Sequence, residues 1–132
     1  MSGSQGRAGE RRLLSHIDVR VADRARATAF YDALFGALDF TGRTGEEWTS
    51  YADRSQPGPM REWFGFTVDP AQRAGTTRVA FTAETRADVD RIAAVVRNAG
   101  AKALEGPDES EGYYALFFED PDGNRLEVCF ID

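Results

Sequence analysis

Hydrophobic and polar residues alternate at the start of the chain and then change to a helical repeat. The segment from Leu13 to Val21 predicts a strand buried on one face, because every second residue from Ile17 onward is apolar. Asp23 is a favourable helix N-cap, and an apolar stripe at helical spacing ends near Gly36, so a helix is predicted between them. Two or three short strands are predicted between Phe40 and Val68, where glycine and proline residues mark the turns.

The same order of elements is predicted again from Thr77. A strand from Thr77 to Ala83 is followed by Thr85 and Asp88, which resemble a capping box at the start of a second helix. That helix is predicted to end between Asn98 and Gly100. Three more strands are predicted around Ala101–Leu104, at Tyr113–Glu119 and at Arg125–Ile131, with a turn at Asp120–Asn124 before the last of them.

Superimposing the two halves indicates that the chain is duplicated. His16 falls on Arg78 at an offset of 62 residues, and the match continues through the first strand and helix of each half. The last strands match at an offset of 64, which places Phe64 on Val128. Such repetition predicts an α+β fold of two tandem βαβββ units that form a curved mixed sheet around a cleft. The units are predicted to cover about residues 12–69 and about residues 76–132 of one domain.

Length and composition are those of an ordinary globular domain. The 132 residues are 42% hydrophobic and 29% charged, with a net charge of -6. The negative charge and the lack of a basic cluster argue against nucleic acid, and no apolar run is long enough to span a membrane. Residues 1–11 are predicted to be a disordered tail, not a signal peptide, and the single Cys129 cannot form an internal disulfide. A cytoplasmic protein is therefore expected.

Three segments together resemble the vicinal oxygen chelate superfamily, which includes glyoxalase I, the fosfomycin- and bleomycin-resistance proteins and the extradiol dioxygenases. They are SHIDVRVADRARATAFYDALFG, TTRVAFTAETRADVDRIAAVVRNAGA and YYALFFEDPDGNRLEVCF, and the resemblance spans about Leu13 to Ile131. The most specific piece is DPDGNRLE, from Asp120 to Glu127. The resemblance implies a cleft that takes a small organic molecule, and a homodimer in which exposed sheet edges are covered.

In metal-dependent relatives, His or Glu side chains on the first and last strand of each unit converge in the cleft, and the resemblance implies which residues stand there in this chain. His16 and Glu127 are suited to a divalent metal. Arg78 stands where a second histidine is expected, and a guanidinium has no lone pair to offer. By strand phase the fourth place falls to Trp63 and not to Glu62. No metal cofactor is therefore expected, and a divalent metal held by His16 and Glu127 is the alternative.

Residues in cleft-facing phase form the predicted site. His16, the only histidine, is a candidate general acid or base or a substrate ligand, and otherwise a hydrogen-bonded strand residue. Arg78 and Glu127 either fill the vacated metal site as an ion pair or act in catalysis, with Arg78 on an anionic or carbonyl oxygen and Glu127 moving a proton. The remaining residues in this phase are predicted to bind the ligand: Trp63, Asp18, Arg20, Thr82 and Arg125.

Three functions are open at this point. The first is a metal-independent isomerase or lyase that binds a small molecule and acts by proton transfer. The second is a binding protein that sequesters a toxic or planar compound, for which Trp48 and Trp63 are candidate aromatic walls. The third is a metal-dependent lyase or dioxygenase. The first requires a base and an electrophile to converge, whereas the second mainly requires aromatic surface.

Overall fold

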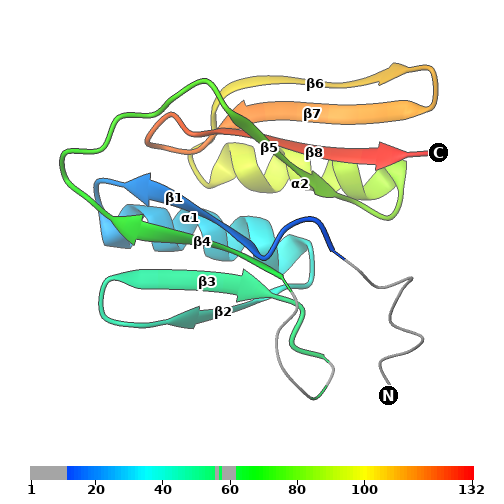
Figure 1. Cartoon of the computed structure of the whole chain (residues 1–132). Helices are drawn as coiled ribbons and strands as arrows, with labels where there is room; N and C mark the ends of the chain where they lie inside the picture. The colour runs from blue at the N-terminus through cyan, green and yellow to red at the C-terminus, as the bar shows by residue number, and fades with distance from the viewer. Residues whose placement is uncertain (1–11, 56, 58–61) are drawn as a thin grey trace.

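The computed structural model describes residues 12–55, 57 and 62–132 of the chain. Within them, two helices and eight strands follow one another in the predicted order, βαβββ twice (Figure 1). The first unit comprises β1 (His16–Val21), α1 (Arg24–Ala37), β2 (Thr41–Thr44), β3 (Trp48–Ala52) and β4 (Trp63–Val68). The second comprises β5 (Arg78–Thr82), α2 (Arg86–Asn98), β6 (Lys102–Ser110), β7 (Tyr113–Glu119) and β8 (Arg125–Ile131). The predicted tail at residues 1–11 lies outside the described residues.

Each unit forms its own four-stranded mixed sheet. The strand orders are β1-β4-β3-β2 and β5-β8-β7-β6. In each sheet the first strand pairs in parallel with the last strand, and the other pairs are antiparallel. Parallel pairing is possible because a helix carries the chain back across the sheet between the two strands. The predicted α+β class and duplicated unit are confirmed, with the sheet divided into two halves.

Both helices begin at the residues that the sequence predicts. The Asp23 side chain accepts a hydrogen bond from the backbone N–H of Arg26, and Thr85 accepts one from that of Asp88. These caps satisfy backbone donors that the first turn of a helix leaves without a partner. Within the described residues, no helix is long and apolar enough to cross a membrane.

The hydrophobic core lies between the two helices and the inner faces of the sheets. Helix α1 contributes Phe30, Tyr31 and Phe35, which are almost fully buried. The ring of Phe30 packs against Phe118, and that of Phe35 packs edge-on against Phe81 at 5.1 Å. Because Phe81 and Phe118 belong to the second unit, α1 packs against both halves. Each sheet therefore buries one face and leaves the other directed away from the core.

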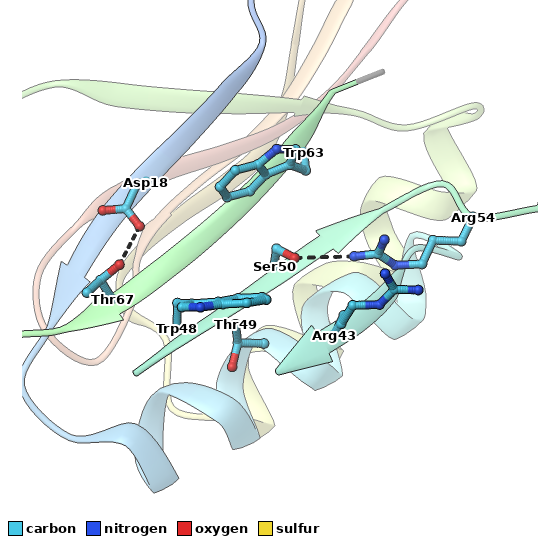
Figure 2. A pocket seen from close by; sticks show the side chains of 8 residues that line it. All are labelled: Asp18, Arg43, Trp48, Thr49, Ser50, Arg54, Trp63 and Thr67. Atoms are coloured by element: carbon cyan, nitrogen blue, oxygen red, sulfur yellow. Dashed lines mark hydrogen bonds between the residues drawn. The ribbon is translucent and has the colours of Figure 1, made fainter. Parts of the chain in front are cut away.

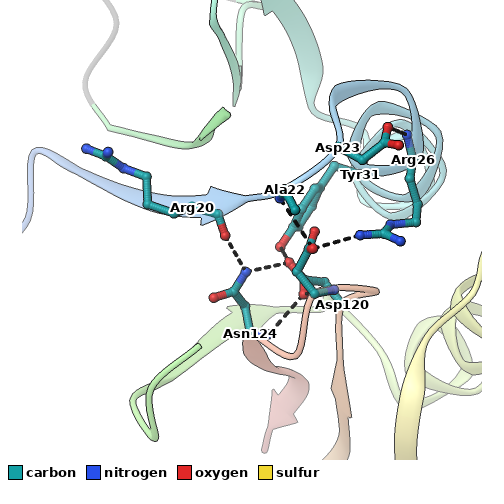
Figure 3. Close-up of polar contacts among 8 residues, drawn as sticks. Arg20, Ala22, Asp23, Arg26, Tyr31, Asp120 and Asn124 are labelled. Atoms are coloured by element: carbon teal, nitrogen blue, oxygen red, sulfur yellow. Dashed lines mark hydrogen bonds and ion pairs between the residues drawn. The ribbon is translucent and has the colours of Figure 1, made fainter. Parts of the chain in front are cut away.

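The turn between β7 and β8 also ties the two units together (Figure 3). Asp120 is completely buried, and its carboxylate accepts a hydrogen bond of 2.5 Å from the Tyr31 hydroxyl of α1. The side-chain amide of Asn124 donates to the same carboxylate oxygen at 2.8 Å. Asp122 accepts a bond of 2.8 Å from Arg26. The segment that carries the family resemblance is thus both a turn and a polar link between the halves.

Candidate functional site

The outer face of the first sheet collects polar and aromatic side chains from all four of its strands. Strand partners share a face of the sheet, so the register decides which residues lie together. Asp18 is paired with Gly65, which is paired on its other side with Ser50. The outer face carries His16 and Asp18 of β1, Trp63, Gly65 and Thr67 of β4, Trp48 and Ser50 of β3, and Arg43 of β2.

A pocket of about 400 Å³ opens on this face. Its lining residues are Asp18, Arg43, Trp48, Thr49, Ser50, Arg54, Trp63 and Thr67. Figure 2 shows Asp18 and Thr67 at one end, Arg43 and Arg54 at the other, and the two indoles between them. The volume is within the range of sites that take small organic molecules.

The two indoles in the pocket are those of the only tryptophans in the chain, and each lies against a glycine. A Cβ atom on Gly45 would lie 2.2 Å from the Trp48 ring, and one on Gly65 would lie 2.9 Å from the Trp63 ring. Because glycine has no Cβ atom, both positions leave room for the indole rings beside them. On β1, the His16 ring stacks on Trp63 with centroids 4.2 Å apart and planes within 3°. His16 thus orients one wall of the pocket without lining it.

The acidic end of the pocket is already neutralised. One Asp18 oxygen accepts a hydrogen bond of 2.7 Å from the Thr67 hydroxyl, and the other accepts one of 3.0 Å from Arg20. The ion pair with Arg20 is partly exposed, so its contribution to stability is small, about 1 kcal/mol or less. The same ion pair offsets the charge of Asp18, which is the only carboxylate among the described residues that line the pocket.

The basic end of the pocket brings two guanidinium groups together. Arg54 donates hydrogen bonds of 3.2 Å to the Ser50 hydroxyl and to the backbone carbonyl of Thr41. Partial burial lowers the pKa of Arg54, and the positive charge of Arg43 lowers it further. Arg43 is exposed and has no hydrogen bond or ion pair within the described residues. Positive charge is therefore concentrated at this end.

The outer face of the second sheet carries a buried carboxylate. Glu127 is only 6% exposed, and its Oε2 atom has no hydrogen-bond partner among the residues that the structure describes. Burial raises the pKa of Glu127, while the charge of Arg78 and a hydrogen bond with Cys129 act in the opposite direction. The Arg78 guanidinium lies over the ring of Phe117, 4.8 Å from its centroid. Since Phe117 is the strand partner of Glu127, the Arg78 side chain reaches across the strand that carries Glu127.

The resemblance to the vicinal oxygen chelate superfamily implies a divalent metal in some members, and the residues of this chain fit one poorly. The register that pairs Asp18 with Gly65 in the first unit pairs Ala80 with Glu127 in the second. Gly65 is therefore the counterpart of Glu127, at a uniform offset of 62 residues. The predicted offset of 64 for the last strands was wrong, although Trp63 does share the outer face. Gly65 has no side-chain donor, and the described residues contain no group of three or more His, Cys, Asp or Glu that suits a metal.

Of the predicted ligand-binding residues, Asp18 and Trp63 line the pocket and the others lie elsewhere. Arg20 binds Asp18 from outside, while Thr82 lines a separate and more polar pocket near α2. Arg125 is the strand partner of Arg78 on the second sheet. Its guanidinium is thus not part of the pocket lining.

The three predicted catalytic residues do not line this pocket, and the predicted ion pair is absent. Within the described part of the chain, no ion pair of 4.0 Å or less joins Arg78 to Glu127, because the guanidinium packs on Phe117 instead. Likewise, no hydrogen bond or ring contact joins His16 to either residue among those described. Their catalytic roles remain predictions.

Sequence reasoning did not single out Arg43 and Arg54 at the basic end of the pocket. Arg43 lies in β2, whose sequence TGRT has no apolar alternation to reveal a face. Arg54 follows β3 and reaches the pocket through hydrogen bonds to neighbouring strands. Trp48 is one of the two predicted aromatic walls, and its pairing with Thr67 assigns it to the outer face.

Comparisons with known proteins identify the family. The family model described as Glyoxalase/Bleomycin resistance protein/Dioxygenase superfamily matches residues 13–128. A search of curated proteins gives no match. A glyoxalase/bleomycin resistance protein from Albidiferax ferrireducens T118 is similar in structure, with a TM-score of 0.77 and 26% identity over 92% of this chain and 100% of that one.

Fosfomycin resistance proteins have the same fold. FosX from Mesorhizobium loti gives a TM-score of 0.67 at 22% identity, over 90% of this chain and 92% of that one. A variant of FosX from Listeria monocytogenes, in complex with Mn(II) and 1S,2S-dihydroxypropylphosphonic acid, gives 0.65 at 19% identity, over 87% of this chain and 86% of that one. Together with the family model, these structures agree with the resemblance noted in the sequence. The chain belongs to the glyoxalase/bleomycin resistance protein/dioxygenase superfamily.

Proposed function

We propose that this chain binds a small organic molecule in the pocket between Trp48 and Trp63, without a metal, as a sequestering protein. The observation that carries the proposal is the lining of the pocket, in which two indoles stand between a polar end and a basic end. Aromatic walls bury the apolar body of a ligand, and a few polar groups at the ends fix its orientation.

Two features support binding over chemical turnover. The described residues that line the pocket include no histidine or cysteine, and the one carboxylate among them, that of Asp18, accepts hydrogen bonds from Thr67 and Arg20 on its two oxygens. A general base needs a free acceptor within reach of the ligand. The pocket lining therefore offers recognition groups without an available base.

Metal independence is supported by the donor set. His16 and Glu127 are the only family-type ligands at the repeat-related places, since Arg78 and Gly65 occupy the other two. The His16 ring stacks on Trp63, and its Nδ1 atom is 3.0 Å from the Ser15 hydroxyl. Two protein donors are fewer than a tight transition-metal site normally has.

The test is a thermal-shift screen of small organic molecules against three forms of the protein. Any ligand that binds only the folded state raises the Tm by mass action. We expect some molecules to raise the Tm of the wild type but not that of Gly45→Ala. The new Cβ would lie 2.2 Å from the Trp48 ring and displace this ring from the pocket wall. Gly36→Ala is the matched control, since its Cβ would meet nothing within 4 Å. Molecules that raise the Tm of Gly45→Ala as much as that of the wild type would show that the ligand binds elsewhere.

A second candidate, proton transfer by Glu127, is supported by the unpartnered Oε2 atom of this buried side chain. Burial raises its pKa, which favours a proton-carrying carboxyl group. Unlike sequestration, this function requires that the protein convert the bound molecule into a product. Turnover that disappears in Glu127→Gln while affinity stays the same would favour catalysis over sequestration.

A further inference from the structure

The two ends of the pocket differ in charge, and this difference restricts the chemistry of the ligand. At the β1 and β4 end, Asp18 is neutralised by Arg20 and accepts a hydrogen bond from Thr67. At the β2 and β3 end, the guanidinium groups of Arg43 and Arg54 both line the pocket, and the only carboxylate among its described lining residues, that of Asp18, is at the other end (Figure 2). The pocket is thus positive at one end, although the whole chain carries a net charge of -6.

Arg43 is the residue at the basic end that is available for a ligand. It is the strand partner of Ser50 and projects from the outer face of the sheet, into the lining of the pocket. Within the described residues it makes no hydrogen bond or ion pair. Arg54 lies close enough for the charge of Arg43 to lower its pKa, and it is held by Ser50 and Thr41. Two like charges held together are stabilised when an anion joins them.

We propose that the ligand is a planar aromatic acid, whose carboxylate binds Arg43 and Arg54 and whose ring lies against Trp48 and Trp63. This inference rests on the proposed function, because it names the ligand class of the same pocket. Guanidinium groups recognise a carboxylate through paired N–H donors, and indoles supply flat apolar surface for a ring. A ligand that carried a carboxylate at both ends is disfavoured, because its second carboxylate would meet the acceptor oxygens of Asp18 and has no hydrogen to donate to them.

The experiment compares two probes of nearly the same shape by isothermal titration calorimetry: 2-naphthoate, which carries the charged carboxylate, and 2-naphthamide, in which a neutral amide replaces it. We expect the wild type to bind naphthoate at least about tenfold more tightly than naphthamide, which is the effect of one charge-assisted hydrogen-bonded pair. Raising the salt concentration is expected to weaken naphthoate alone. In Arg43→Met the preference is expected to shrink towards equal affinities, with naphthamide binding little changed.

Arg97→Met is the matched control, because Arg97 lies in the last turn of α2 and is exposed away from the pocket. It is expected to retain the full preference for naphthoate. Equal affinity of the wild type for the two probes would overturn the proposal that the ligand is an acid, but it would not contradict the proposed binding function of the pocket. A preference that persists in Arg43→Met, or naphthoate binding too weak to measure while other molecules bind in the screen, would also overturn it. A screen in which no molecule raises the Tm of the wild type would instead contradict the proposed function.

Discussion

Glu127 combines burial, an unpartnered oxygen and a nearby positive charge in one side chain. In the described part of the chain its Oε2 atom has no hydrogen-bond partner, while the charge of Arg78 and a hydrogen bond with Cys129 lower the pKa of the carboxylate. The balance raises the pKa of Glu127, with burial as the largest cause. A buried carboxylate therefore costs stability at neutral pH, because the unfolded chain ionises more easily than the folded one.

Glu127→Gln is expected to stabilise the protein at neutral pH by about 1 kcal/mol, or roughly 4 °C in Tm. The raised pKa means that the folded wild type binds the proton more tightly than the unfolded chain. The cost of ionisation is thus fully present above the folded pKa and disappears as pH falls below the ordinary value of 4.5. The gain from Glu127→Gln should shrink over the same interval. Thermal melts of both proteins across this pH range measure the effect.

Glu105→Gln serves as the control for that series, because Glu105 is an exposed residue of β6. Its melting temperature is expected to follow the wild type at every pH. A gain for Glu127→Gln that persists undiminished at acid pH would show that the stabilisation comes from packing and not from ionisation.

The metal content of the purified protein also depends on single residues. We expect less than stoichiometric Zn, Ni, Fe or Mn after purification without chelator, because Arg78 and Gly65 supply no donor at two of the four repeat-related places. Elemental analysis measures this directly. One equivalent of metal in the wild type that is lost in His16→Ala would contradict the expectation.

At the scale of elements, the β7–β8 turn and helix α1 are joined by the hydrogen bond from Tyr31 to Asp120. Tyr31→Phe is expected to lower the free energy of unfolding by about 1.5–3 kcal/mol, the range for a hydrogen bond to a buried charged group. Urea denaturation gives this value from the shift in midpoint. Burial and the neighbouring Asp120 charge also raise the pKa of Tyr31, so the hydroxyl stays protonated as a donor.

Tyr114→Phe is the matched control for the link between the units. Its hydroxyl donates to Asp90 at 2.5 Å, the same distance as from Tyr31 to Asp120, but at an exposed position. Its loss is expected to change stability by no more than about 0.5 kcal/mol. Similar losses in the two variants would mean that burial of the link contributes little.

The elements themselves could be predicted from local patterns, whereas the pocket could not. The strand at Tyr113–Glu119 and the caps at Asp23 and Thr85 follow from alternation and capping chemistry, which are properties of neighbouring residues. The match between the last strands failed because it aligned apolar residues such as Phe64 and Val128, whereas the pairing of each last strand with the first strand of its unit sets an offset of 62 residues. A register between distant strands has no local signal, so Gly65 was missed as the counterpart of Glu127.

At the scale of the whole molecule, the described chain leaves apolar side chains and sheet edges exposed. Leu13 is 97% exposed and Ile131 is 65% exposed. Strands β2 and β6 form sheet edges, each with one neighbour in its sheet. Exposed edges and apolar residues favour association with another copy, which removes both from water.

A homodimer is therefore expected, with a mass near twice the 14.6 kDa of the chain. Ile131 lies on the outer face of β8 with Glu127 and Cys129, so Ile131→Lys is expected to shift the equilibrium towards the monomer. Ala94→Lys, on the exposed side of α2, is the control and should remain dimeric. Light scattering at micromolar concentrations measures the mass. A wild-type particle of 14.6 kDa across this range would contradict the dimer, and equal dissociation of the two variants would exclude the outer face of β8 as its interface.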